Sequence, residues 1–562
     1  MKRCELAVMP PNVPVKTGTK HGGHPGKAPK INIMKILKTY LLIMICLSVA
    51  PYGDTAQGAE SPAGYTNMNY EWMTYNDCRS VMNMAEKEIR ENPASENSYA
   101  MLGMAYFYSG NYKEAAAYLQ KAVNINPLRL EIKNKLEFAA KTRDIINSYE
   151  TNETEHFIFR AHPRDGILKY YAIDSLEESY EKLAPLLGFN MDRKIVVEIY
   201  STRDDFNYAS TLTKKQIEVS GAIGICKFNR IMIVSPRCLA FGFRWLDSLA
   251  HELVHYMILH TGGPDTPLWL NEGAAKYYET IWRSEDSLYL APLFKNVLAE
   301  ALEKNQWVTF SKMRYGMPNL DNNKEVTLAF AEAAAGVDYI ISSHDTARLT
   351  GLIREFMNNK DENKVFKKTI GVSSVRFFEN LKNHLKTLKL TVTKGVVFDN
   401  YKLKDEKVNE IEEYVGLETR GYVLLGDKFK RDKAYKVALI EYEKGLKQEP
   451  ENSVILDKMG KTYFDMGNYL EAENKLRESL KYNPNSCNTY LNLGELLIAQ
   501  NRLDEALKSL EQSNQINPYN PLLHREMGII LFNKNRKEDS IKEFKITLML
   551  DPYDNEVRNW LK

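Results

Sequence analysis

The stretch from Trp245 to Thr280 reads WLDSLAHELVHYMILHTGGPDTPLWLNEGAAKYYET. It contains the pattern H-E-x-x-H at His251, Glu252 and His255. Residues four positions apart lie on the same face of an α-helix, so both imidazoles can approach one metal ion. The carboxylate of Glu252 lies beside the first histidine and could take a proton from water and pass it to a leaving amine. The spacing predicts a helix that carries a metal site for hydrolysis.

A catalytic zinc site needs a third protein ligand and one position open to water. Glycines and a proline at 262–264 end the first helix, and the sequence N-E-G-A-A at 271–275 begins a second one. Glu272 is the predicted third ligand. Thr261 occupies the position of the last histidine in H-E-x-x-H-x-x-G-x-x-H, and His260 points to another face. We therefore expect one Zn²⁺ per chain, held by two histidines and one glutamate.

Length, composition and charge limit the other possibilities. A chain of 562 residues exceeds the size of one core, which predicts several domains. The content of 44% hydrophobic and 26% charged residues is typical of a soluble globular protein. The net charge of +2 and the lack of a basic stripe with interleaved aromatics argue against nucleic acid as a partner.

The N-terminal residues 1–59 are expected to be an extension followed by a signal peptide. From Met34 the sequence MKILKTYLLIMICLSVA places two lysines before an apolar run, which is too short to span a bilayer comfortably. Ala56, Gly58 and Ala59 offer a cleavage site. An exported protein, periplasmic or extracellular, is predicted. An uncleaved membrane anchor or a buried helix is the alternative, and the true start is either Met1 or Met34.

The cysteine content is low for this length. Four of the six cysteines follow the signal region, namely Cys78, Cys226, Cys238 and Cys487, and none forms a C-x-x-C pair that could hold zinc. We expect thiols, with a bridge between Cys226 and Cys238 as the alternative.

Two regions contain a repeat of 34 residues. Prolines at this step are Pro93 and Pro127 near the N-terminus, and Pro450, Pro484, Pro518 and Pro552 near the C-terminus. Glycines at one fixed offset are Gly103, Gly426, Gly460, Gly494 and Gly528, and small residues follow half a repeat later at Ala115, Ala438, Ala472, Ala506 and Ser540. The pattern resembles the tetratricopeptide repeat, whose small residues let two antiparallel helices approach. We expect one clear and one degenerate repeat within 60–149, and four within 419–562.

The segment 150–395 between these repeats is expected to be an α+β domain. HFIFR at 156–160 and KIVVEIY at 194–200 are typical of strands, with an amphipathic helix at 165–187 between them. The stretches 221–226 and 230–235 predict a hairpin just before the motif helix.

The motif region resembles a known family. H-E-L-V-H followed by W-L-N-E-G-A-A is similar to the gluzincin metallopeptidases, in particular to bacterial proteins that join a peptidase MA-like domain to tetratricopeptide repeats. The resemblance implies that His251, His255 and Glu272 bind zinc and that Glu252 is the general base and acid. It also implies an α+β zincin-like metallopeptidase domain flanked by all-α tetratricopeptide-repeat solenoid segments, with a linker at 396–418.

The predicted hairpin is a candidate substrate-binding element. In metallopeptidases an edge strand beside the metal commonly binds the substrate backbone by strand addition. Gly221, Ala222, Ile223 and Gly224 are the residues expected to do so here. The equally supported alternative is an ordinary core strand.

One feature of the family is missing. A later helix, aligned with Leu328 to Glu332, would carry a tyrosine that donates to the oxyanion, but this sequence has Phe330 there. Replacement donors among nearby residues are Tyr277, Tyr278, Tyr339 and His344.

Lys276 and Asp247 each lie one helical turn from a predicted zinc ligand. Lys276 replaces the acid that supports a histidine in some related zincins, which predicts that this contact is absent. Asp247 either orients His251 or, as we favour, interacts only with the helix dipole.

We therefore expect an exported zinc-dependent metallopeptidase whose repeats recruit a protein substrate or partner on their concave face. Endopeptidase action is preferred, because no amine-anchoring G-x-M-x-N stands upstream of the motif helix. One alternative is a catalytically weak or inactive zinc-binding scaffold for cell-envelope assembly. In another, the histidines are structural and bind no metal.

Overall fold

The computed structural model describes residues 77–562 apart from 192, 214–221, 240, 284–290, 314–319, 321, 393–410 and 412–413. The predicted signal segment with its cleavage site, the beginning of the degenerate repeat, Gly221 and most of the predicted linker lie outside the described residues.

In the part of the N-terminal repeats that the structure describes, from residue 77 on, there are four helices. These are α3 (Cys78–Glu91), α4 (Glu96–Tyr108), α5 (Tyr112–Ile125) and α6 (Leu130–Ile146), and consecutive helices pack on one another. The pair α4 and α5 is the repeat that ends at Pro127. Side chains of Ser95 and Asp77 cap the starts of α4 and α3 by accepting backbone N–H groups, so these helix boundaries are encoded locally.

The C-terminal repeats form four helix pairs and a final short helix. The pairs are α19 (Leu417–Arg431) with α20 (Tyr435–Gln448), α21 (Ser453–Asp465) with α22 (Tyr469–Tyr482), α23 (Cys487–Ala499) with α24 (Leu503–Ile516), and α25 (Pro521–Asn533) with α26 (Lys537–Leu550), followed by α27 (Asn555–Trp560). The repeated glycine explains how closely the two helices of a pair approach. A Cβ at Gly460 would lie 2.7 Å from Leu476, and one at Gly494 would lie 2.6 Å from Leu510. Each clash falls on the residue sixteen positions later, so a larger side chain would separate the helices.

The described residues of the central domain form one five-stranded sheet. Its strands are β1 (Glu150–Glu153), β2 (Phe157–Ala161), β3 (Ile195–Tyr200), β4 (Gly224–Lys227) and β5 (Arg230–Val234), in the order β1-β2-β3-β5-β4. The pairs β2/β3 and β3/β5 are parallel, whereas β1/β2 and β4/β5 are antiparallel. The short helix η1 (Pro163–Leu168) and α7 (Lys169–Leu187) connect β2 to β3, and α8 (Arg203–Ser210) follows β3.

The predicted hairpin before the motif helix is confirmed. β4 and β5 pair from Lys227 and Arg230 outward, and the two turn residues Phe228 and Asn229 have φ of 54° and 59°. This left-handed pair is the geometry of a tight hairpin whose twist matches that of its strands. The hairpin places β4 at the edge of the sheet.

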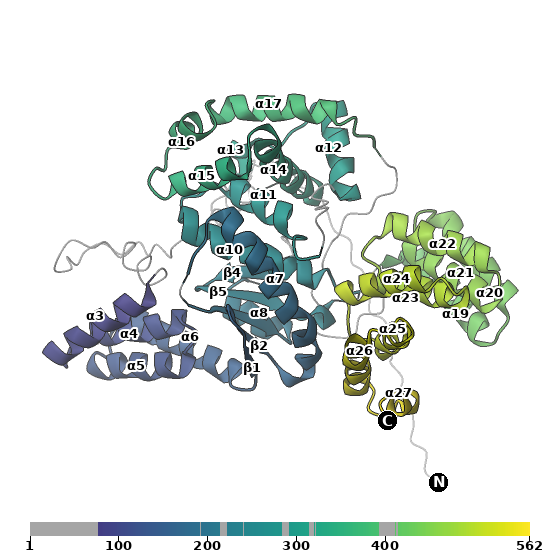
Figure 1. Cartoon of the computed structure of the whole chain (residues 1–562), viewed down its shortest axis with the longest axis horizontal. Coiled ribbons are helices and arrows are strands. Elements are labelled where there is room, and N and C mark those ends of the chain that lie inside the picture. The colour runs from purple at the N-terminus through teal and green to yellow at the C-terminus, as the bar shows by residue number, and fades with distance from the viewer. Residues whose placement is uncertain are drawn as a thin grey trace, which may run out of the picture. The chain divides into compact units, whose positions relative to one another are not determined.

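Two buried helices follow the sheet. α10 (Trp245–Gly262) begins after η2 (Pro236–Cys238) and packs against β4, β5 and α7, and α11 (Leu268–Tyr278) packs against α10 and α14 (Asn323–Ser343). Figure 1 shows α11 between α10 and a group of helices. That group contains α12 (Pro292–Lys304), α13 (Phe310–Met313), α14, α15 (Thr346–Phe356), α16 (Glu362–Thr369) and α17 (Ser374–Thr387).

The close packing of α11 on α14 depends on Gly273. A Cβ at this position would lie 2.3 Å from the carbonyl oxygen of Ala333. The two helix backbones are therefore in contact, which fixes the position of the neighbouring Glu272.

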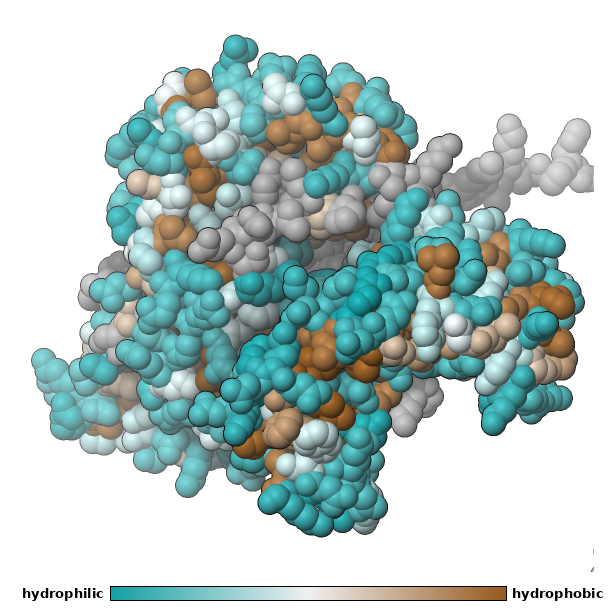
Figure 2. All heavy atoms as spheres, turned by 45° about the vertical axis from the view of Figure 1, so that its right-hand side comes forward, coloured by the Kyte–Doolittle hydropathy of each residue, from teal (hydrophilic) through white to brown (hydrophobic). Residues whose placement is uncertain are grey.

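The fold class predicted from the sequence is confirmed: a mixed sheet with packed helices is flanked by tetratricopeptide-repeat helices. The face drawn in Figure 2 is mostly hydrophilic, with small hydrophobic patches. Cys78, Cys226, Cys238 and Cys487 are buried and form no disulfide in the described part of the chain, so the alternative bridge between Cys226 and Cys238 is not formed.

Helix α14 combines an apolar composition with one buried carboxyl group. By length and hydropathy the segment Lys324–Ser343 would also suit a membrane span, but half of it is buried inside the protein, as in a core helix. Glu332 on this helix is fully buried; its Oε1 accepts the N–H of Val308 at 2.9 Å, and its Oε2 has no hydrogen-bond partner among the described residues. Burial raises the pKa of Glu332 well above its usual value.

This raised pKa predicts a pH-dependent loss of stability. The contribution of Glu332 to the free energy of unfolding is fully present below the pKa that this residue has in the unfolded chain. It falls as the pH rises toward the pKa in the folded chain, because the unfolded chain then releases a proton that the folded chain retains. The advantage of Glu332→Gln over wild type is expected to grow by about 1–3 kcal/mol between pH 5 and pH 8. Thermal unfolding at the two pH values measures this, with the exposed Glu303→Gln as control. An equal effect at both pH values would contradict the prediction.

Candidate functional site

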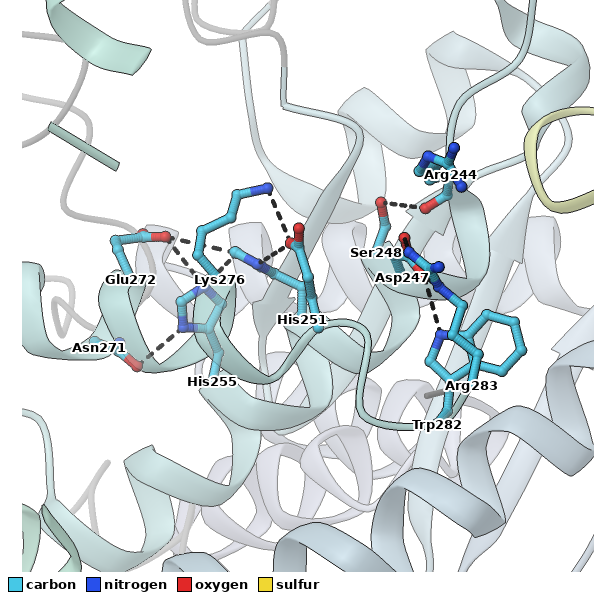
Figure 3. A network of polar contacts seen from close by, with 11 residues as sticks. Arg244, Asp247, Ser248, His251, His255, Asn271, Glu272, Lys276, Trp282 and Arg283 are labelled. Atoms are coloured by element: carbon cyan, nitrogen blue, oxygen red, sulfur yellow. Dashed lines mark hydrogen bonds and ion pairs between the residues drawn. The ribbon is translucent and has the colours of Figure 1, made fainter. Parts of the chain in front are cut away.

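The side chains of His251, His255 and Glu272 converge between α10 and α11 (Figure 3). The two histidine Nε2 atoms are 3.1 Å apart. Oε2 of Glu272 lies 3.4 Å from Nε2 of His255 and 3.6 Å from Nε2 of His251. The structure thus brings all three sequence-predicted ligand residues to one point, with two imidazole nitrogens and one carboxylate oxygen facing one another.

The other ring nitrogen of each histidine has a partner of its own. Nδ1 of His255 lies 2.9 Å from Oδ1 of Asn271, and Nδ1 of His251 lies 3.2 Å from Oε2 of Glu279. Because both partners accept, each Nδ1 carries the proton in the neutral ring, and each Nε2 lone pair points into the cluster. The rings are held in the orientation that a metal ion requires.

As expected, no acid at position 276 supports a histidine, but another residue supplies this contact. Lys276 itself donates to Glu279 at 2.9 Å, and Glu279 supplies the carboxylate that contacts His251. Glu279 comes seven residues after Glu272, which is two helical turns and therefore the same face. That spacing is the sequence signal that could have identified it.

The contacts of Asp247 lead to the segment after α11 and not to a histidine, so Asp247 does more than the favoured interaction with the helix dipole alone. Its carboxylate accepts from Nε1 of Trp282 at 3.0 Å and from Nε and Nη2 of Arg283 at 3.0 and 2.9 Å. Asp247 therefore joins the start of α10 to the segment after α11 (Figure 3). His260, on another face of α10, lies 3.0 Å from Oδ1 of Asn229, and burial lowers its pKa to about 3.

The charges of the cluster favour the ionised form of Glu272 and the protonated form of His255. Burial alone would raise the pKa of Glu272, but His255 and His251 hold it well below its usual value. Burial would likewise lower the pKa of His255, but Glu272 raises it to about 9. The ion pair of Glu279 with Lys276 outweighs burial and lowers the pKa of Glu279 to about 2. Glu272 is thus ionised over the whole physiological range.

Glu252 lies against the edge strand β4 and is close enough to the three predicted ligand residues to interact with their charges. It is buried, and burial first, with Glu272 adding to it, raises its pKa. Its carboxylate accepts the backbone N–H of Cys226, and a Cβ at Gly224 would lie 2.9 Å from its Oε1. A carboxylate with a raised pKa is suited to taking up and returning a proton near neutral pH.

The predicted substrate-binding residues lead into this edge strand. Gly224 begins β4, Ala222 and Ile223 precede it, and among the described strands only β5 pairs with β4. Because pairing alternates along an antiparallel strand, Gly224 and Cys226 direct their backbone groups away from β5. Glu252 of α10 therefore lies at the edge of β4 with which no described strand pairs.

Phe330 and the candidate oxyanion donors have the following neighbours. Phe330 is near Lys276, whose Nζ is 5.8 Å from the ring centroid. Tyr278 is buried and its hydroxyl bonds Thr346, whereas Tyr339 packs against Phe377 and His384. His344 is exposed at the end of α14, and Tyr277 packs on Tyr278.

Comparisons with known proteins agree with this architecture. Residues 175–387 match the model of the Peptidase MA superfamily, and residues 97–129 and 463–512 match tetratricopeptide repeat models. The chain therefore joins a Peptidase MA superfamily domain to tetratricopeptide repeats, which confirms the resemblance seen in the sequence. No curated protein matched the chain.

Solved structures resemble part of the chain. A crystal structure of MamA is 23% identical, with a TM-score of 0.22, and the match covers 24% of this chain and 77% of MamA. MamA from Desulfovibrio magneticus RS-1 is 20% identical, with a TM-score of 0.24, over 26% of this chain and 83% of that one. A thermophilic tetratricopeptide-repeat protein of Thermus thermophilus is 22% identical, with a TM-score of 0.23, over 25% of this chain and 77% of that one.

Proposed function

We propose that the protein is a zinc-dependent metallopeptidase. The observation that carries this proposal is the triangle of donor atoms, with sides of 3.1, 3.4 and 3.6 Å. Ligands about 2.0–2.2 Å from a tetrahedral zinc ion lie about 3.3–3.6 Å from one another. The chemistry fits as well, because two imidazoles and one carboxylate leave the fourth position for water. His251, His255 and Glu272 would hold the ion.

The residues around this triangle can perform amide hydrolysis. Zinc, when bound, would act as a Lewis acid for the water and the substrate carbonyl. Oε1 or Oε2 of Glu252 accepts a proton from the attacking water and delivers it to the leaving nitrogen. Asn271 and Glu279 keep both imidazoles oriented through Nδ1 while this happens.

The substrate would bind as an added strand on β4. The backbone groups at Gly224 face the open edge of the sheet, next to Glu252. Strand addition reads the peptide backbone along its length and needs no free amine, which supports endopeptidase action.

The repeats would recruit a protein, as such solenoids present a concave binding surface. Export is the further part of the proposal and rests on the apolar run after Met34. A catalytically weak or inactive zinc-binding scaffold for cell-envelope assembly is the second candidate, and the observation in its favour is Phe330, which cannot donate to an oxyanion.

Two measurements on the purified full chain test the proposal. Stoichiometric zinc and chelator-sensitive hydrolysis of an unfolded protein, restored by added zinc, would support a peptidase. Zinc binding without hydrolysis would favour the scaffold function. A chain that takes up no zinc would exclude both candidates and leave the histidines a structural role.

The contact between Gly224 and Glu252 predicts a specific loss of activity. In Gly224→Ala the added methyl group would meet Oε1 and Cγ of Glu252 at 2.9 and 3.1 Å, so the carboxylate must move. We expect kcat/KM to fall about 10–100-fold, because a shift of about 1 Å in a catalytic group can cost this much. Zinc content should stay unchanged, since Glu252 is not a ligand.

The matched control is Gly351→Ala, where an added Cβ has no atom within 4 Å. Its activity should equal that of wild type. Full activity in Gly224→Ala would show that Glu252 is not held against β4 during catalysis.

A further inference from the structure

The segment that leads into the metal-binding helix is held by the C-terminal repeats. The backbone N–H of Phe243 donates to the carbonyl oxygen of Ile516 at 3.0 Å, and Nε1 of Trp245 lies 3.4 Å from the carbonyl oxygen of Asn514. Both acceptors lie at the end of α24, in the third repeat. Residues more than 260 positions apart in the chain thus meet at the start of α10.

Arg244 adds three side-chain contacts to the same surface. Its Nε donates to Oδ1 of Asn485 at 3.1 Å, and its Nη1 donates to Oε1 of Gln512 at 3.0 Å and of Gln515 at 3.3 Å. Arg244 is also the N-cap residue of α10, and this cap makes no side-chain hydrogen bond to the helix. The N-cap side chain of α10 therefore binds the repeats instead of capping its own helix.

The backbone at Gly242 packs closely against Ile516 and Asn517 at the end of α24. Its φ is +78°, and a Cβ there would lie 2.2 Å from the carbonyl oxygen of Ile516 and 2.9 Å from Cβ of Asn517. The preceding Phe241 is buried among repeat side chains, with its ring centroid 4.6 Å from that of Tyr414. No side chain larger than hydrogen fits between the two backbones at this point.

A second contact fixes the same repeats to the sheet. Asp165, fully buried after β2, accepts from Nε of Arg237 at 2.6 Å and from Oγ of Ser235 at 3.0 Å, and the hydroxyl of Tyr519 donates to it as well. Tyr519 follows directly on the turn that receives Phe243. The turn after α24 is therefore attached both to the sheet and to the motif helix.

We propose that the turn after α24, centred on Ile516 and Asn517, positions α10, so that the C-terminal repeats control metal retention. His251 lies six residues after Trp245 on one continuous helix, about 9 Å along its axis. A displacement of the helix start therefore moves His251 and His255 relative to Glu272, which is held separately by the packing of α11 on α14. A protein bound to the repeats could act on the site through this contact. The metal part of this inference rests on the proposed function.

The test compares two glycine variants of the full chain. Gly242→Ala meets the carbonyl of Ile516, whereas Gly467→Ala, at φ +79° in the second repeat, has no atom within 4 Å of the added Cβ. Both substitutions place alanine at nearly the same positive φ, so the difference between the variants reports mainly the contact with Ile516. We expect faster amide hydrogen exchange in α10 by about tenfold and zinc affinity weakened by about tenfold in Gly242→Ala only.

Arg244→Ala keeps the test decisive if Gly242→Ala does not fold, because it removes three hydrogen bonds and adds no atom. It should show the same two changes to a smaller extent. Wild-type exchange in α10 and wild-type zinc affinity in folded Gly242→Ala, or in Arg244→Ala, would overturn the proposal. Hydrogen exchange needs no metal, so a wild-type chain that binds no zinc would refute the proposed function while the exchange still decides whether the repeats position α10.

Discussion

Replacing Glu252 by glutamine is expected to reduce hydrolysis of an unfolded protein substrate by about two to four orders of magnitude, the range that a positioned acid or base contributes. Glutamine keeps the shape of the side chain and can still accept the N–H of Cys226. It cannot take up a proton from water. The loss should therefore appear in kcat, with little change in substrate binding.

Zinc content separates this effect from damage to the site. The Nε2 atoms of both histidines and the carboxylate of Glu272 are untouched in Glu252→Gln, so the variant should retain as much zinc as wild type. The exposed Glu303→Gln on α12 is the matched control and should have full activity. Equal and negligible turnover in wild type and Glu252→Gln, with zinc present in both, would instead favour the scaffold function and would identify Phe330 as the cause to examine.

Local sequence rules account for much of the site. His251 and His255 share a helix face because four residues make about one turn, and the helix break at 262–264 lets Glu272 fold back against them. The hairpin at Phe228 and the repeat helices also follow from short-range patterns. All these features connect residues fewer than about forty positions apart, where turn and helix chemistry decides the geometry.

The features that sequence reasoning missed depend on tertiary packing. Glu279 contacts His251 only because the chain remains helical just past the end of α11. Strand β1 reads E-T-N-E, without the alternation of a buried strand, and forms by pairing with β2. The contact of Phe243 with Ile516 joins two domains, and no local pattern in either one predicts it.

Replacing Glu272 by alanine is expected to have the largest effect on the metal. The variant loses one of three ligands and the charge that offsets that of the ion, so zinc affinity should fall by more than the about 10–100-fold that loss of an outer hydrogen-bond partner costs. Glu279→Ala measures that smaller value directly, because among the described residues the side-chain contacts of Glu279 go to Nδ1 of His251 and to Lys276. The two variants therefore separate binding the ion from orienting a ligand.

Competition with a chromophoric chelator measures both affinities, and circular dichroism checks that the repeats remain folded. Added zinc should raise the melting temperature of wild type, should raise that of Glu279→Ala less at the same concentration, and should leave that of Glu272→Ala unchanged, because ligand binding stabilises only through the affinity that remains. Wild-type zinc affinity in Glu272→Ala would assign the third ligand to another residue. Weaker binding in Glu279→Ala than in Glu272→Ala would reverse the two roles, since a carboxylate that only orients His251 cannot matter more than one that faces both Nε2 atoms.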